Sequence, residues 1–292
     1  MERKTREAEA AIEAAIEAAV AVAAAHGLAP AEPEVLAVGS NVMVRLRPFP
    51  LVARVAGGTA LVRSGPAWLA REVAVAAFVA GCGAPALGPS SLLPPGPHAH
   101  GGRAITFWPL IETAVAADRA AAAVALRRCH QALEGYRRTL PPLAPLEETG
   151  RLLDHPLVRP VLDAGDRALL VRAVDGAAAR VAASAPALRP LHGDAHAGNC
   201  FATSAGPRWT DWEDACAGPI EWDLACLVCW PWAEGDRAEV ERCLDAYGAP
   251  AEEALLRALV ALRLVQAAVW HALVRKAPHP RAVDRLRALG CT

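Results

Sequence analysis

Leu191-His192-Gly193-Asp194-Ala195-His196-Ala197-Gly198-Asn199 is the stretch of sequence that decides the fold, together with Asp211-Trp212-Glu213 further along the chain. These polar residues interrupt long apolar helical patterns, at a place where a packed core favours apolar side chains. Phosphate transfer needs a carboxylate beside the attacking hydroxyl and a few oxygen ligands for Mg²⁺, because positioning and charge neutralisation drive the reaction. Asp194, Asn199 and Asp211 supply that set of oxygen atoms.

The spacing of these residues is typical of kinases, in which a catalytic Asp is followed five residues later by Asn and then by a metal-binding Asp before an aromatic residue. The string HGDxHxxN, then DWE, then Gly218-Pro219-x-x-Trp222-Asp223-Leu224-Ala225, resembles the aminoglycoside phosphotransferase and choline kinase superfamily, in particular its phosphotransferase-enzyme branch. The resemblance runs from about Val35 to at least Ala225 and implies a protein-kinase-like fold.

The resemblance implies a role for each polar residue of the motif. Asp194 is the catalytic base or the residue that orients the hydroxyl, Asn199 and Asp211 bind magnesium, and Asp223 braces the catalytic loop from within the core. The alternative for Asp194 is an ordinary carboxylate in a loop or at a helix cap, where Asp is common.

The histidines and acids next to these residues have less defined roles. In the family, His192 and His196 shape the loop, and a direct chemical role for either is the alternative. Glu213 and Asp214 follow the metal-binding Asp and either contact a second cation or a cationic substrate, or form a solvated acidic turn.

The rest of the chain predicts an α+β fold with two lobes. A leading helix over residues 2–26 precedes an antiparallel hairpin with a bend at Pro48–Pro50, a helix from Pro66 to about Ala80, a Pro/Gly-rich loop and a strand over Ala104–Leu110. We expect residues 1–108 to form a nucleotide-binding lobe and residues 109–292 a helical catalytic and substrate lobe. The predicted helices of this second lobe are Asp118–Tyr136, Asp166–Ala183, Glu221–Trp230, Ala238–Tyr247 and Ala251–Val274.

The turn Gly39-Ser40-Asn41 lies where the family covers the nucleotide phosphates with backbone NH groups. Ser40 and Asn41 are therefore candidate nucleotide-binding residues, although an ordinary β-turn without a ligand explains the same sequence. The chain has no GxGxxG string here, as is true of many members of this superfamily.

Arg54 occupies the position at which protein kinases have a phosphate-binding lysine, which departs from the kinase pattern. Glu72 follows eighteen residues later in a nearly apolar helix, where a buried carboxylate needs a cationic partner. We expect an Arg54–Glu72 ion pair equivalent to the kinase Lys–Glu bridge. A solvated Glu72 is the alternative.

Phe107 and Trp108 lie in the expected hinge segment, where the backbone would bind the adenine edge and the rings could line its pocket. Core packing explains these two aromatic residues equally well. His98 and His100, in the preceding loop, are expected to be exposed.

The acceptor site is the least defined part of the prediction. In the family, variable helices of the second lobe cover the catalytic loop, and acidic groups beside tryptophans suit a cationic, partly apolar acceptor. Tryptophans on amphipathic helices are also common core residues. The candidate substrate residues are Glu213, Trp230, Trp232, Glu234 and His271.

Composition excludes several other classes of protein. The formal net charge of −1, from 30 basic and 31 acidic residues, lacks the positive field of a nucleic-acid binder. No run of about 18 uncharged apolar residues and no signal peptide is present, so we expect a cytoplasmic protein with no membrane or obligate protein partner. Cys226 and Cys229 form the only CxxC, which predicts two packed thiols, with a zinc site as the alternative.

These observations predict an enzyme that transfers the γ-phosphate of ATP, with Mg²⁺, to a hydroxyl of an antibiotic-like, aminoglycoside-type or related small molecule, as in antibiotic resistance. A metabolic kinase of choline, homoserine, thiamine or a sugar is an alternative, because the same machinery serves all of them. A nucleotide-binding pseudokinase without catalysis is another. The acceptor, the choice of ATP or GTP and the oligomeric state stay open.

Overall fold

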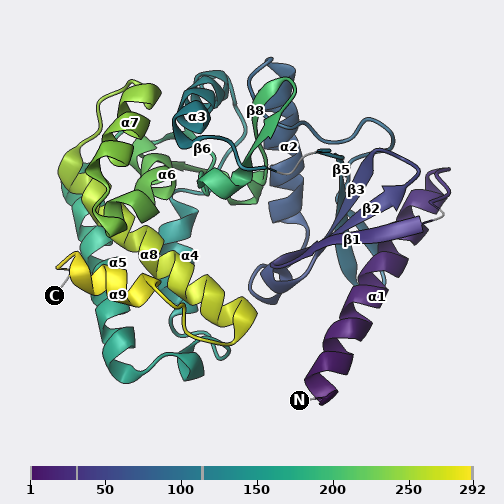
Figure 1. Cartoon of the computed structure of the whole chain (residues 1–292), viewed down its shortest axis with the longest axis horizontal. Helices are drawn as coiled ribbons and strands as arrows, with labels where there is room; N and C mark the ends of the chain where they lie inside the picture. Colours follow the sequence, from purple (N-terminus) through teal and green to yellow (C-terminus); the bar gives the residue numbers. More distant parts are fainter. Residues whose placement is uncertain (1, 31, 113–114, 291–292) are drawn as a thin grey trace. The chain divides into compact units, whose positions relative to one another are not determined.

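The computed structural model describes residues 2–30, 32–112 and 115–290. The chain divides into two compact units: Met1–Gly81 with Leu87–Thr113, and Cys82–Ala86 with Ala114–Thr292. The predicted fold class is confirmed, because an antiparallel sheet is followed by a mainly helical part (Figure 1).

The first unit contains a five-stranded antiparallel sheet in the order β1-β2-β3-β5-β4 (Figure 1). The predicted hairpin and the strand predicted before the hinge are both present, as β2, β3 and β5. β1 extends the sheet by one strand, and β4 lies in the stretch that was expected to be a loop. The strands are β1 (Glu32–Val38), β2 (Asn41–Arg47), β3 (Leu51–Ala56), β4 (His98–His100) and β5 (Arg103–Pro109).

The leading helix α1 (Glu2–Ala25) packs on this sheet, and β3, which lies between β2 and β5, is buried along its whole length. The centre of the α1 contact is made of small residues, including Ala15, Ala19 and Ala23, while Ile16 and Val20 pack at its margin. Small side chains let a helix approach closely, which explains why the larger residues do not mark the buried face.

Helix α2 (Ala67–Gly81) follows Pro66 and confirms the predicted helix. Proline is favoured at such helix starts because its fixed φ suits the first turn. The buried face of α2 carries Trp68, Leu69 and Val75, and Glu72 lies on that same face.

The second unit is a group of helices joined by short strands. All five helices predicted here are present, as α3, α5, α6, α7 and α8, whereas the two short helices α4 and α9 were not predicted. The helices are α3 (Arg119–Leu133), α4 (Ala144–Leu152), α5 (Ala164–Ser184), α6 (Ile220–Glu234), α7 (Arg237–Tyr247), α8 (Glu253–Arg275) and α9 (Ala282–Ala288). The strands are β6 (Arg189–Leu191), β7 (Cys200–Thr203), β8 (Gly206–Trp209) and β9 (Cys216–Gly218).

Helix α8 lies in the core of this unit and contacts α4, α5, α6 and α9. By length and composition alone it could cross a membrane, but 61% of its most apolar window is buried inside the protein, as is common for a core helix.

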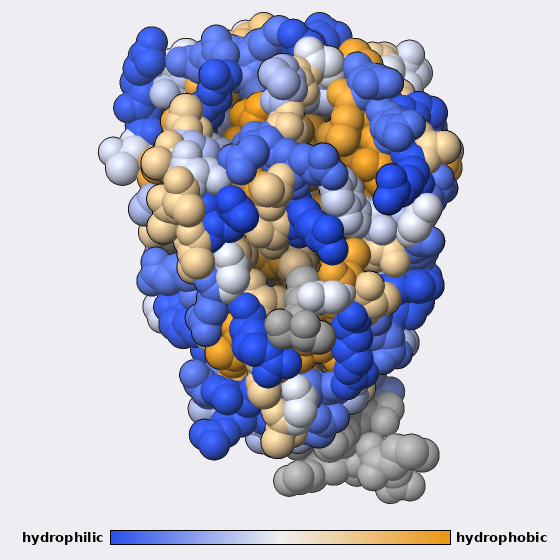
Figure 2. Space-filling view, turned by 90° about the vertical axis from the view of Figure 1, so that its left-hand side faces the viewer, coloured by the Kyte–Doolittle hydropathy of each residue, from blue (hydrophilic) through white to orange (hydrophobic). Residues whose placement is uncertain are grey.

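Figure 2 shows the side of the molecule on which α7 and α9 lie, where hydrophilic side chains are interspersed with hydrophobic ones.

Candidate active site

The loop that carries Asp194 leaves β6, which pairs antiparallel with β9. Gly193 has a φ of +88°, a conformation that L side chains rarely adopt. A Cβ atom on this residue would lie 1.9 Å from the carbonyl oxygen of Asp214. The turn before Asp194 therefore requires glycine, and it packs against the segment that follows Asp211.

Asp223, in the first turn of α6, is fully buried behind this loop. One of its carboxylate oxygens accepts a hydrogen bond from the backbone NH of Gly193 at 2.9 Å. The other accepts from the backbone NH of His192 at 2.8 Å and lies 2.8 Å from Nε2 of His130. Hydrogen bonds to a charged group are stronger than neutral ones, so this carboxylate fixes the backbone of the catalytic loop.

The side chain of His192 is built into the same scaffold. Its Nε2 lies 2.9 Å from the carbonyl oxygen of Thr210, and its Nδ1 accepts the backbone NH of Asp194 at 3.3 Å. The ring packs against Trp209 and Trp212, with centroid distances of 5.1 and 4.4 Å. These contacts leave the ring buried and holding the two loops together.

Asn199 links the catalytic Asp to the second loop. Its Nδ2 donates to the backbone oxygen of Asp194 at 3.0 Å and to the Oδ2 of Asp194 at 3.2 Å. The backbone carbonyl oxygen of Asn199 accepts hydrogen bonds from the backbone NH and the Oγ1 of Thr210, at 2.8 and 3.1 Å. Thr210 immediately precedes Asp211, so the loop that carries Asp194 and Asn199 is hydrogen-bonded to the start of the segment that carries Asp211.

These residues fit a magnesium ion by the chemistry of their donors. Because Nδ2 of Asn199 is used toward Asp194, the amide oxygen of Asn199 is the atom left to bind a metal, and Asp211 would supply a carboxylate. Mg²⁺ is usually bound by one or two protein oxygens and completed by water and substrate phosphates. Asp211 has a φ of +63°, which is uncommon outside glycine and is found at functional turns. Their role as metal ligands stays a prediction.

The charge closest to Asp194 comes from Arg263 in the middle of α8, which the sequence analysis did not single out. Nη2 of Arg263 lies 2.8 Å from Oδ1 of Asp194. Burial alone would raise the pKa of Asp194, but the charge of Arg263 holds this pKa below its usual value. The available signal was one arginine between Leu262 and Leu264 in an otherwise apolar stretch of helix.

His196 lies on the other side of Asp194, with Nε2 3.5 Å from Oδ2. Its Nδ1 accepts the backbone NH of Gly198 at 3.0 Å, which closes a local turn. Burial lowers the pKa of His196, although the negative charge of Asp194 acts in the opposite direction. His196 is thus a neutral neighbour of Asp194 near pH 7.

Glu213 lies in the short turn Trp212–Asp214 after Asp211 and is buried. Little of its side chain is therefore presented to a substrate.

Three other predicted substrate residues gather at the C-terminal part of the second unit. Trp230 stacks on His279 at 5.4 Å, and His271 contacts the same ring at 5.0 Å.

Arg281 occupies the positions expected for a cationic substrate. Its guanidinium lies over the ring of Trp230 at 5.0 Å, and its Nη1 donates to the carboxylate of Glu234 at 3.1 Å. Trp230 and Glu234 thus already bind a cation, which the protein itself supplies.

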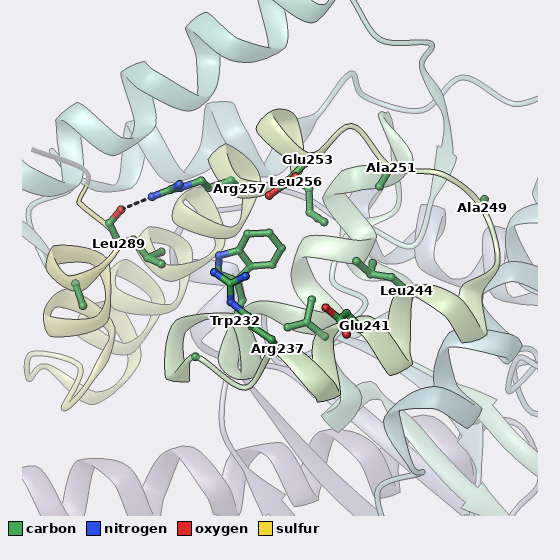
Figure 3. Close-up of a pocket in the computed structure, with 13 residues that line it drawn as sticks. Trp232, Arg237, Glu241, Leu244, Ala249, Ala251, Glu253, Leu256, Arg257 and Leu289 are labelled. Atoms are coloured by element: carbon green, nitrogen blue, oxygen red, sulfur yellow. Dashed lines mark hydrogen bonds between the residues drawn. The ribbon is translucent and has the colours of Figure 1, made fainter.

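Trp232 lies apart from this group, because residues two positions apart on a helix face different directions. It lines a cavity of about 560 Å³ formed mainly by α7 and α8 and by the end of α9 (Figure 3). Leu244 and Leu256 supply apolar walls, and Arg237 lies beside Trp232. The five predicted substrate residues therefore do not form one site.

In the first unit, Arg54 of β3 and Glu72 of α2 form the predicted ion pair, with 5% and 1% of their side chains exposed. With its side-chain oxygen oriented toward Arg54, Asn41 accepts from Nε and Nη2 of that guanidinium at 3.0 and 2.7 Å. The carbonyl of Ser40 accepts the backbone NH of Thr59 at 3.2 Å. Nucleotide binding by these residues stays a prediction.

Phe107 and Trp108 are both buried in the first unit. Phe107 belongs to its main apolar core, and its backbone NH and carbonyl already bond to Pro95 and Ser90. Trp108 donates from Nε1 to the hydroxyl of Thr106 at 2.9 Å. Core packing thus accounts for Phe107, which presents no surface to an adenine ring.

Cys226 and Cys229 are buried on α6. Burial raises the pKa of the Cys229 thiol to about 12 and that of Cys226 well above its usual value. Both groups are therefore protonated thiols near pH 7, which agrees with packing as their role.

Comparisons with known proteins place this geometry in context. The phosphotransferase enzyme family matches residues 61–262, and no curated protein matches the chain. Among solved structures, the amicoumacin kinase hAmiN, in complex with AMP-PNP, Ca²⁺ and Ami, is 13% identical with a TM-score of 0.67, covering 88% of this chain and 86% of that one.

Two further structures share the fold. The choline kinase LicA from Streptococcus pneumoniae is 16% identical with a TM-score of 0.66, over 89% of this chain and 92% of that one. The GDP and kanamycin complex of APH(2")-IIia is 14% identical with a TM-score of 0.62, over 90% and 93%. Because the family match covers more than half of the sequence, the chain belongs to the phosphotransferase enzyme family, whose members are ATP-dependent kinases of small molecules.

Proposed function

We propose that this chain transfers the γ-phosphate of ATP to a hydroxyl group of a small molecule, with Asp194 as the group that receives the hydroxyl proton. The observation that carries the proposal is the hydrogen-bonded cluster in which Asn199 joins Asp194 to Thr210, the residue before Asp211. This cluster provides a carboxylate for the acceptor beside two oxygen donors for a divalent ion.

In the proposed reaction, the acceptor oxygen bonds to the γ-phosphorus while the bond from that phosphorus to the bridging oxygen of ADP breaks. The hydroxyl proton passes to the carboxylate of Asp194, and ADP leaves with the electron pair of the broken bond. The lowered pKa of Asp194 keeps this carboxylate ionised near pH 7, so its main contribution is to orient the hydroxyl.

Asn199 and Asp211 would hold Mg²⁺, which when bound neutralises charge on the transferring phosphate. Asp223 and His192 would support this arrangement without touching the substrate, because their contacts go to the loop backbone and to Thr210. In the first unit, we assign phosphate binding to Arg54, held by Glu72, and to the turn at Ser40 and Asn41.

For the acceptor, we propose an antibiotic-like small molecule with a free hydroxyl. The amicoumacin kinase and the kanamycin complex support this class, and the choline kinase supports a metabolic acceptor as the second candidate. Trp230 and Glu234 are already occupied by Arg281, so they give no support for a cationic acceptor. A role in resistance, and a cytoplasmic location, belong to the same proposal.

The test is a phosphorylation screen of the purified protein with MgATP. The panel contains aminoglycosides, peptide and nucleoside antibiotics, choline, homoserine, thiamine and sugars, and each reaction is measured by ADP release and by the mass of the product. An added phosphate on one acceptor identifies the substrate class. Absence of ADP release with every acceptor, in a protein that MgATP does not stabilise thermally, would contradict the proposal and favour a pseudokinase or a protein without a nucleotide site.

A further inference from the structure

Arg263 is a charged residue of the second unit to which the predicted site assigns no role. Arg263 lies midway along α8. Its neighbours in sequence, Leu262 and Leu264, are fully buried. Its side chain is 15% exposed, and that of Asp194 is 18% exposed. A guanidinium in such surroundings is costly to desolvate unless a carboxylate compensates its charge.

The surroundings of Arg263 fix the direction in which it points. Its Nη1 donates to the side-chain oxygen of Gln266, which lies one turn further along α8, and its Nη2 faces Asp194. Burial alone would lower the pKa of Arg263, but the charge of Asp194 raises it above its usual range. Cys226 and Cys229 lie on the facing helix α6 as neutral thiols. Asp194 is therefore the main compensating charge for Arg263.

The two oxygens of the Asp194 carboxylate differ in their contacts. Oδ2 accepts from Asn199 at 3.2 Å and lies 3.5 Å from His196. Oδ1 lies 2.8 Å from Nη2 of Arg263, yet among the described residues none donates a well-aligned hydrogen bond to it. Oδ1 is shielded from solvent, so the nearby charge of Arg263 holds this oxygen on the inner side of the carboxylate.

We propose that Arg263 is a positioning residue for phosphate transfer, which holds Oδ1 of Asp194 and so keeps the carboxylate in the orientation in which it meets the acceptor hydroxyl. This inference rests on the proposed function. Oδ2 is held by Asn199, so each oxygen of the carboxylate is fixed by a different residue. Without Arg263, the carboxylate keeps only its Asn199 and His196 contacts and can rotate away from the acceptor.

The charge of Arg263 also bears on the acceptor. A positive group on the carbon next to the reacting hydroxyl would lie within a few ångströms of the guanidinium and be repelled by it. The same side chain therefore favours acceptors whose hydroxyl has no ammonium group directly beside it.

The test compares Arg263→Gln and Arg263→Lys with the wild type and with Arg275→Gln, a control at the exposed end of the same helix. Turnover is measured as ADP release from MgATP, with water and with each acceptor of the panel described above. We expect Arg263→Gln to lower kcat by about 10²-fold, as for a misplaced catalytic group, with the KM for ATP changed by less than about threefold. Arg263→Lys should recover most of this loss, and Arg275→Gln should match the wild type.

A double-mutant cycle separates positioning from a merely structural role. If Arg263 acts through Asp194, adding Arg263→Gln to Asp194→Asn should cost little further turnover, because the group that it positions is already disabled. If the loss of turnover in the double variant equals the product of the losses in the two single variants, the inference is overturned. Undiminished turnover in Arg263→Gln would also overturn it. If Arg263→Gln does not fold, the lysine variant decides: a folded Arg263→Lys with the turnover of a catalytically dead enzyme contradicts the inference, and one near wild type supports it.

The failure of the proposed function has a different signature. A wild-type protein that transfers phosphate to no acceptor, water included, overturns the proposed function and this inference together. A wild-type protein that turns over normally, with an equally active Arg263→Gln variant, overturns the positioning role alone.

Discussion

Each unit of this protein contains an arginine packed against a carboxylate, Arg54 with Glu72 and Arg263 with Asp194, and the two pairs differ in what else surrounds them. Arg54 and Glu72 in the first unit are almost completely buried, and Asn41 accepts two further hydrogen bonds from the guanidinium when its side-chain oxygen is oriented toward Arg54. Asp194 and Arg263 in the second unit are several times more exposed, and Oδ1 of Asp194 accepts no aligned hydrogen bond from the described residues.

The clear difference between the two pairs is side-chain exposure, which is 5% and 1% for Arg54 and Glu72 and 15% and 18% for Arg263 and Asp194. Breaking a buried ion pair leaves an uncompensated charge and lowers stability. In a partly open pair, the loss of one partner mainly changes how the other is oriented. Mutation of the first pair should therefore change stability as well as MgATP binding, whereas mutation of the second should mainly change turnover.

Asp194→Asn should give the largest effect. The side chain keeps its shape but can no longer receive the hydroxyl proton, so kcat should fall by about 10²- to 10⁴-fold. The measurement is ADP release with the acceptor found in the screen, and MgATP should still raise the melting temperature, since the nucleotide contacts are assigned to other residues. Asp175→Asn, an exposed position on α5, is the matched control. Turnover near that of the control would remove Asp194 from the mechanism.

Glu72→Gln should lower the free energy of unfolding by about 3 kcal/mol or more, because Arg54 would remain buried without a compensating charge. Urea denaturation measures this change, with Glu13→Gln on the exposed side of α1 as the control. The double variant Arg54→Met, Glu72→Leu removes both charges and should recover much of the stability. If it also binds MgATP as well as the wild type, the phosphate-binding role of Arg54 is wrong.

Much of the fold was visible in the sequence because helix periodicity and proline positions report local structure. The hairpin bend at Pro48–Pro50, α2 after Pro66 and the five long helices of the second unit were all predicted. Short elements such as α4, α9 and β4 were not, since a few residues carry too little periodic signal. In α1, alanine obscured the buried face, because alanine fits both sides of a helix.

The candidate site was predictable where its residues are close in sequence. Asp194, Asn199 and Asp211 follow a fixed spacing, and the Arg54–Glu72 pair could be inferred from a lone acid in an apolar helix. Arg263, by contrast, comes from a helix far along the chain, and only tertiary packing brings it to Asp194. The predicted substrate residues failed to form one site for the same reason, because the direction of each side chain on α6 depends on how that helix packs.

Asp223→Asn tests the hydrogen bonds that hold the loop of Asp194 and should have an intermediate effect. The amide would replace a carboxylate that accepts from His192 and Gly193, and losing the charge from such hydrogen bonds costs about 2 kcal/mol. Both stability and kcat should fall, because the catalytic loop loses its anchor. Asp245→Asn, an exposed position on α7, should change neither. A loss of stability with unchanged kcat would show that the loop is positioned by other contacts.

The smallest effect should come from an ion pair that is exposed, which completes the comparison with the two buried pairs. Asp118 caps α3 by accepting the NH of Ala121 at 3.1 Å, and it forms two hydrogen bonds with Arg242 of α7 at 2.9 and 2.8 Å. The hydrogen bonds from Arg242 lower the pKa of Asp118 to about 2. The contribution of Asp118 to stability is therefore fully present above about pH 4 and is lost as the pH falls toward 2.

Asp118→Ala should lower the free energy of unfolding by about 1 kcal/mol, mainly through the lost cap. Asp236→Ala is the matched control, because Asp236 caps α7 on the NH of Glu239 at 3.1 Å and has no ion pair among the described residues. The two losses, measured by urea denaturation at pH 7, should differ little, and any difference should shrink in 1 M salt because solvent and ions screen an exposed pair. A salt-resistant loss several times larger for Asp118 would mean that exposure does not decide how much an arginine–carboxylate pair stabilises this protein.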